Sequence, residues 1–79
     1  MTALSIDKIE EWENNHDIYN LILALKNGEE DVRASAAAAL GYLKDERAIQ
    51  PLIKTLEEEH SFQVYRNAAD SIRKIKQAQ

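Results

Sequence analysis

Cysteine is absent from the chain, proline occurs once and glycine twice. The absence of cysteine excludes disulfide bonds, thiolate metal sites and cysteine nucleophiles, and it fits a reducing compartment. No stretch approaches the roughly 20 consecutive apolar residues of a membrane span, and the N-terminus lacks the basic and apolar regions of a secretory signal. These absences predict a soluble, cytoplasmic protein that does not enter a membrane.

Motifs for catalysis, metal binding and phosphate binding are missing as well. The sequence has no glycine-rich phosphate loop, no nucleophile elbow and no pair of histidines at metal-ligand spacing. His16 and His60 each stand alone, and the carboxylates occur in runs that are typical of solvated helix faces. We therefore expect no enzymatic activity, no cofactor and no metal site.

The residues that are present favour helices. Of the 79 residues, 44% are hydrophobic and 30% are charged, which is typical of a folded globular protein. Strong helix formers such as alanine, leucine, glutamate, lysine and glutamine are abundant. This composition predicts one small all-α domain whose core is near the minimum size for stability.

Four segments carry apolar stripes at helical spacing, and together they form two copies of one helix pair. The stripes of the two first helices are 31 residues apart: Ile18, Leu21, Ile22 and Leu25, then Ile49, Leu52, Ile53 and Leu56. The stripes of the two second helices are 32 residues apart: Val32, Ala36, Ala39, Leu40 and Leu43, then Val64, Ala68, Ser71, Ile72 and Ile75, in a last helix expected over residues 62–76. Because no helix can bury its stripe alone, the helices must pack on one another.

The segments between the stripes carry signals for helix ends. Gly28 is expected to end the first helix of the first copy in the left-handed conformation, and Asp45 to cap the first helix of the second copy. Pro51 is expected to kink that helix. The acids at 57–59 are expected to fray its C-terminus, where the helix dipole disfavours negative charge. Gly41 is expected to permit close approach of another backbone.

Residues 2–14 precede the two copies and do not match their pattern. Ser5 is the expected N-cap of a short helix, in which Ile6, Ile9 and Trp12 form an apolar face. Terminal units of repeat proteins are usually atypical, because their outer surface meets solvent. We expect this segment to cover the first copy, with Trp12 packed as a lid.

The most specific pattern runs from Asp31 to Leu56. It consists of Asp31-Val32-Arg33, Ala36-Ala37, Ala39-Leu40-Gly41, Leu43, Asp45-Glu46-Arg47-Ala48-Ile49, Pro51-Leu52-Ile53 and Leu56. With its period of about 31 residues it resembles the HEAT repeat family, specifically the short HEAT-like repeats first associated with phycobilisome lyases, over about residues 18–75. The chain departs from the family pattern at Lys44 and Arg73, where glycine is usual, at Tyr65, which replaces the first-turn arginine, and at Tyr19, which replaces the proline.

The resemblance implies an all-α fold, a short right-handed α-solenoid of about two HEAT-like helix pairs plus an N-terminal capping helix. Residues 1–79 would form a single domain, with the capping helix at 1–14, the first repeat at 15–43 and the second, more degenerate repeat at 44–79. In such a solenoid Arg33 and Asp45 are expected to hold the loops between helices rather than to contact a partner.

The resemblance also implies that the second helices line a concave surface that binds another protein. Opposite the buried stripe, a small-residue strip that includes Gly41 would lie beside its charged counterpart in the second copy. The residues expected to bind the partner are Ala34, Ala38, Tyr42, Phe62, Gln63, Arg66, Asn67, Asp70 and Arg73. The predicted function is a non-enzymatic scaffold or adaptor for an amphipathic segment of another protein. The alternative interpretation is a strip of good helix formers beside a solvated charged face.

Charge is distributed unevenly along the chain. The net charge is −6 over residues 1–31, −1 over 32–60 and +3 over 61–79. An acidic and a basic end would suit head-to-tail contact, so a homo-oligomer through the exposed repeat ends is a further expectation, although the charges could simply keep both ends solvated. Two other functions stay open: an accessory piece of a chromophore-lyase system, and a weak nucleic-acid binder that uses Arg66, Arg73, Lys74 and Lys76.

Overall fold

The computed structural model describes residues 5–79, and within this range it contains helices and no strand. The expected all-α fold is confirmed. The first four residues of the expected capping segment lie outside the described residues. The elements are α1 (Ile6–Asn14), α2 (Ile18–Asn27), α3 (Glu30–Leu43), a 3₁₀ turn η1 (Glu46–Ala48), α4 (Ile49–Glu58) and α5 (Phe62–Gln77).

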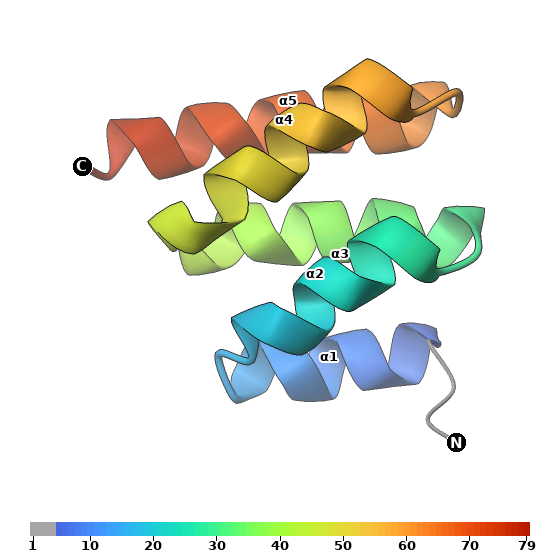
Figure 1. Cartoon of the computed structure of the whole chain (residues 1–79). Coiled ribbons are helices and arrows are strands. Elements are labelled where there is room, and N and C mark those ends of the chain that lie inside the picture. Colours follow the sequence, from blue (N-terminus) through green and yellow to red (C-terminus); the bar gives the residue numbers. More distant parts are fainter. Residues whose placement is uncertain (1–4) are drawn as a thin grey trace.

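The helices form two layers (Figure 1). In one layer α1, α3 and α5 lie side by side and run in the same direction, and α3 packs on both of its neighbours. In the other layer α2 and α4 cross in front of them, with α2 packed on α3 and α4 packed on α5. The N-terminal helix packs on both α2 and α3, and it extends the row of second helices. It therefore forms part of the surface on which a solenoid of this kind presents its second helices.

The predicted apolar stripes form the core. Leu21, Leu40, Leu52 and Ile75 are fully buried, and the other stripe residues are buried or half-buried. Trp12 is 5% exposed, as expected of a lid. Ile6, expected on the same apolar face, is 44% exposed instead, because it lies in the first turn of α1, ahead of the part that packs on the core.

Short polar side chains begin three of the helical elements. The Asp17 Oδ1 atom accepts a hydrogen bond from the Asn20 N–H at 3.2 Å, and the Ser61 Oγ atom accepts one from the Val64 N–H at 3.3 Å. Asp45 caps the 3₁₀ turn η1 that precedes α4. Ser5 occupies the expected N-cap position of α1, but its side chain makes no capping hydrogen bond.

Two backbone expectations need correction. Gly28 ends α2 with φ −75°, in extended rather than left-handed conformation. The left-handed residues are His16, with φ 53°, in the turn after α1, and Lys44, with φ 56°, at the end of α3. Lys44 is the position at which the family pattern has glycine, because the chain must reverse there directly after the helix.

The structure gives a physical reason against two expectations about α4. Pro51 is the third residue of α4, within the first turn, where backbone N–H groups have no partner inside the helix. Its missing donor therefore removes no helix hydrogen bond and gives no reason for a kink. At the other end, Glu59 directly follows the helix and its side chain is only 9% exposed, held by Arg33 rather than frayed.

Candidate functional site

The junction between α3 and α5 is held by hydrogen bonds to backbone carbonyl groups. The Ser71 hydroxyl donates to the Ala37 carbonyl oxygen at 2.6 Å, and the Asn67 amide donates to the Ala34 carbonyl oxygen at 2.9 Å. Gly41 lies against Ser71, so close that an added Cβ would stand 2.6 Å from the Ser71 Cβ and 2.8 Å from its Cα. The close approach expected at Gly41 is thus confirmed, but the residue is buried and does not belong to an open strip.

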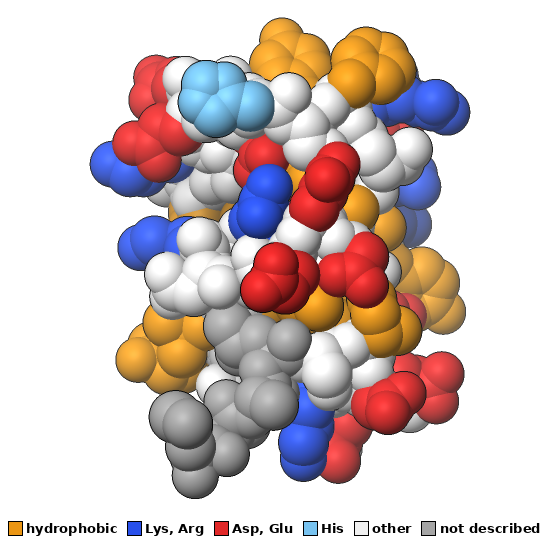
Figure 2. Space-filling model, turned by 90° about the vertical axis from the view of Figure 1, so that its right-hand side faces the viewer, with side chains coloured by type: hydrophobic (Ala, Val, Ile, Leu, Met, Phe, Trp, Pro, Cys, Tyr) orange, Lys and Arg blue, Asp and Glu red, His pale blue; other side chains and the backbone are white. Residues whose placement is uncertain are grey.

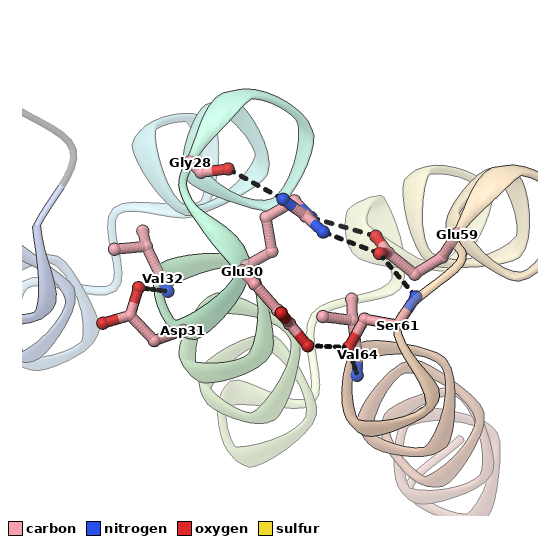
Figure 3. Close-up of polar contacts among 8 residues, drawn as sticks. Gly28, Glu30, Asp31, Val32, Glu59, Ser61 and Val64 are labelled. Atoms are coloured by element: carbon pink, nitrogen blue, oxygen red, sulfur yellow. Dashed lines mark hydrogen bonds and ion pairs between the residues drawn. The ribbon is translucent and has the colours of Figure 1, made fainter.

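An ion pair joins the loops of the two helix pairs at the end where α3 and α5 begin (Figure 3). Arg33 donates from Nε to Glu59 Oε1 at 3.0 Å, from Nη2 to Oε2 at 2.7 Å, and from Nη1 to the Gly28 carbonyl oxygen at 3.1 Å. Ser61 extends the network by donating from its N–H to Glu59 and from its hydroxyl to Glu30. The expected loop-holding role of Arg33 is confirmed.

The pKa values of this pair shift in opposite directions. The guanidinium of Arg33 lowers the pKa of Glu59 through its hydrogen bonds, and Glu59 raises the pKa of Arg33 in return. Both groups therefore stay charged over the physiological range, which suits a structural contact.

A second carboxylate holds the loops at the opposite end of the helices. Asp45 accepts hydrogen bonds from Arg47 Nε at 3.0 Å and Nη2 at 2.7 Å, and its Oδ2 lies 3.1 Å from His16 Nε2 in the turn between α1 and α2. The hydrogen bonds from Arg47 and then the contact with His16 keep the pKa of Asp45 well below its usual value. Asp45 thus holds the loops, as expected.

Acidic side chains gather over the middle of the end at which α1, α3 and α5 begin (Figure 2). Glu30 and Asp31 lie in the first turn of α3, and Asp7 lies in the first turn of α1. Negative charge at this position is favoured by the positive end of the helix dipole. These acids therefore have a structural explanation. A more open surface lies on the side of the α1, α3 and α5 layer that faces away from α2 and α4.

A shallow groove runs between α1 and α3 on that side and reaches α5. Its lining includes Ile6, Glu10 and Glu13 of α1, Ser35, Ala38 and Tyr42 of α3, and Lys74 of α5. Ala38, which is exposed, forms the floor of the groove, and its small side chain keeps the groove open. The ring of Tyr42, which is 71% exposed, lies beside Ala38. The groove offers small and aromatic contacts in the middle and charged groups at its margins.

The two margins of this groove carry opposite charge. The α1 margin has the carboxylates of Glu10 and Glu13. On α5, Asp70 pairs with Arg73 and with Lys74, and its pKa is lowered, mainly by the hydrogen bond from Lys74. Of these charged groups on α5, Lys74 is the one that lines the groove, so it supplies the positive charge of this margin.

The nine residues predicted to bind a partner do not form one site. Ala38 and Tyr42 line the groove, whereas the backbone of Ala34 and the amide of Asn67 are used in the α3–α5 junction. Gln63 hydrogen-bonds to Asn67, and Phe62, at the start of α5, is 74% exposed. The remaining three, Arg66, Asp70 and Arg73, lie on α5 outside the lining of the groove, and Asp70 pairs with Arg73.

Sequence reasoning missed the α1 side of the groove. Ile6, Ile9, Glu10 and Glu13 follow one another at i, i+3, i+4 and i+7, so the spacing places them along one side of α1. This spacing is present in the sequence, but the interpretation of the segment as a cap assigns it no contact with a partner. Nothing local in the sequence marks Ser35, and Lys74 is named there only as a candidate for nucleic-acid binding.

No helix within residues 5–79 is long and apolar enough to cross a bilayer. In the same range no three or more His, Asp or Glu side chains are grouped so that they could hold a metal ion.

Comparison with known proteins identifies the family. The model of the family described as HEAT repeats matches residues 18–79, that is, α2 to α5, and α1 lies outside the match. No curated protein and no solved structure matches the chain. HEAT repeats are generally protein-interaction scaffolds, usually without catalytic activity, and they form α-α solenoids. Since the match covers most of its length, the chain belongs to the HEAT repeat family.

Proposed function

We propose that the chain is a non-enzymatic adaptor of the cytoplasm that binds a helical segment of another protein in the groove between α1 and α3. The observation that carries this proposal is the groove itself, with the exposed Ala38 as its floor and Tyr42 beside it. A low floor lets a partner helix approach closely, and an exposed aromatic ring is a frequent anchor in protein interfaces.

The charges at the margins describe the partner. A helix lying in the groove would meet Glu10 and Glu13 on one side and Lys74 on the other. The complementary segment is an amphipathic helix with small or apolar residues along its contact stripe, basic residues on one flank and acidic residues on the other.

Affinity capture from native extract tests the proposal. Wild type is compared with Ala38→Glu, which fills the groove, and with Ala69→Glu, the same change at an exposed alanine of α5 away from the groove. We expect wild type and Ala69→Glu to retain one partner that Ala38→Glu loses, while all three keep the same circular dichroism. Retention of the partner by Ala38→Glu would contradict the proposal.

A photo-crosslinker at Tyr42 identifies the bound segment. Because this side chain is 71% exposed, a benzoyl-phenylalanine should be accepted there without loss of stability. We expect cross-linked peptides with the helical spacing and flanking charges described above. Peptides that share no such pattern would show that the groove does not recognise a helix of this kind.

The same capture tests the two other functions. The resemblance to phycobilisome-lyase repeats supports a chromophore lyase as one class of captured partner. A nucleic acid is less well supported, because Asp70 already pairs with two of the four cations on α5, Arg73 and Lys74. Recovery of nucleic acid that is released by moderate salt would favour that function over the adaptor.

A further inference from the structure

The residues of α3 that contact α5 have equivalents on α5, and these equivalents define the side of α5 on which a further helix would pack. On α3 this side contains Ala37, whose carbonyl group binds Ser71, and Gly41, which lies against the same serine. The repeat offset of 32 residues places the equivalents of these positions at Ala69 and Arg73 on α5. This side of α5 points away from α3, and no described helix packs on it (Figure 1).

The exposed fractions of side chains in the second copy show that this side of α5 is not covered by any described helix. Leu40 of α3 is fully buried, whereas its equivalent Ile72 is only half-buried. Tyr65, the equivalent of Arg33, is 45% exposed. We call this surface the α5 end face, and it consists of Tyr65, Ala69, Ile72, Arg73 and Lys76.

The α5 end face does not suit another helix pair packed in the way α5 packs on α3. That packing requires a residue without Cβ at Gly41, because a Cβ there would overlap Ser71. The equivalent residue on α5 is Arg73, and Lys76 lies three residues further on. Arg73 already pairs with Asp70 on the same helix, whereas Lys76 has no such partner among the ion pairs of the described residues. A covering surface must therefore leave room for long side chains and must offer negative charge, above all to Lys76.

The opposite end of the stack, on the outer side of α1, offers this negative charge. Asp7, Glu11 and Asn14 are exposed, and they follow at i, i+4 and i+7 on the side of α1 opposite the buried Ile9 and Trp12. We call these three residues the α1 end face. Glu11 has only a long contact of 3.7 Å with an exposed lysine, so its charge remains available to a partner.

We infer that copies of this chain associate head to tail, with the α5 end face of one copy on the α1 end face of the next. The carboxylates of Asp7 and Glu11 would then meet Arg73 and Lys76, over the apolar contacts of Ile72. A symmetric contact between two α5 end faces would place like charges opposite each other, which is unfavourable. The head-to-tail contact is heterologous, so it adds copies in a row.

The expected association is weak and depends on salt. Each end face lies on a single helix, which is small for a stable interface. Its charges are exposed, and salt screens exposed charges over a Debye length of about 8 Å at physiological ionic strength. We therefore expect oligomers at high protein concentration and low salt, and dissociation when salt is raised.

Sedimentation equilibrium over a range of protein and salt concentrations measures the association. The variants are Arg73→Glu/Lys76→Glu, which reverses the α5 end face, and Asp7→Lys/Glu11→Lys, which reverses the α1 end face. The control is Lys26→Glu/Lys54→Glu, which makes the same charge change as the α5 variant at two exposed lysines beside the groove between α2 and α4. Circular dichroism establishes that all three remain folded.

We expect each end-face variant alone to remain monomeric at 9.0 kDa, and the control to associate as wild type does. An equimolar mixture of the two end-face variants should recover association, because each retains the face that the other needs. A wild type that stays monomeric at high concentration in low salt overturns the inference. So does a mixture that stays monomeric, or a control that loses association to the same extent as the α5 variant.

Discussion

Arg33 in α3 and Glu59, which follows α4, form a two-fold hydrogen-bonded ion pair across 26 residues of sequence, at 3.0 and 2.7 Å. The same guanidinium also binds the carbonyl group of Gly28, in the loop that precedes its own helix. One side chain thus connects the loop of the first helix pair to the loop of the second. The second pair has Tyr65 at the equivalent position, so it cannot make the same connection.

Loss of this ion pair should destabilise the protein clearly. The side chains of Arg33 and Glu59 are only 25% and 9% exposed, so Arg33→Ala leaves a largely buried carboxylate without its partner. We expect a loss of about 2–3 kcal/mol in the free energy of unfolding, measured with urea. Lys54→Ala breaks an exposed pair with Glu58 and should cost less than about 0.5 kcal/mol. Equal effects of the two variants would contradict this role for Arg33.

Stability should fall as the solution becomes acidic. The pKa of Glu59 is lowered below its usual value of 4.5 by Arg33, and that of Asp45 is lowered below 3.8 by Arg47. Each carboxylate binds protons more readily in the unfolded chain, so its contribution is fully present above the unfolded pKa and is lost as pH falls through the folded one. Urea midpoints should be constant down to about pH 5 and then decrease. In Glu59→Gln the decrease should be shallower, and an unchanged slope would exclude Glu59 as a cause.

Gly41→Ala should reverse the usual effect of this substitution. In an open helix, alanine in place of glycine stabilises by about 1 kcal/mol. Here the new Cβ would overlap the Cβ and Cα atoms of Ser71, so α3 and α5 must move apart. We expect a net loss of about 1–3 kcal/mol, measured by urea unfolding. A stabilised variant would show that the junction has more room than these distances imply.

Trp12→Ala should affect stability and binding together. Trp12 is the only tryptophan and is 5% exposed, so its removal leaves a large cavity beneath α1. We expect a loss of about 3–5 kcal/mol, measured by circular dichroism during thermal unfolding. Partner capture through the groove should be lost as well, because α1 forms one of its margins. Trp12→Phe, which keeps most of the volume, should lose much less of both. A Trp12→Ala variant that keeps its stability would exclude α1 as an integral part of the core.

The Ala-rich helix α3 shows how far sequence reasoning could place the site. Its spacing predicted the helix correctly, but Ala37 is fully buried whereas Ala38 is exposed. Alanine is a good helix former on any face, so the pattern of apolar residues does not distinguish a contact with α5 from an open groove. For this reason Gly41 was expected on an open strip although it lies in a junction.

The sequence by itself determined the helices, their repeated pairing and the core, because the spacing of large apolar residues along one chain decides which face of each helix leaves water. The tertiary structure alone decided that α1 joins the row of α3 and α5 and forms one margin of the groove. It also decided that Glu59 is held in place rather than frayed, since its partner Arg33 lies on another helix. Such contacts depend on where helices lie relative to one another, and no local spacing in the sequence specifies that arrangement.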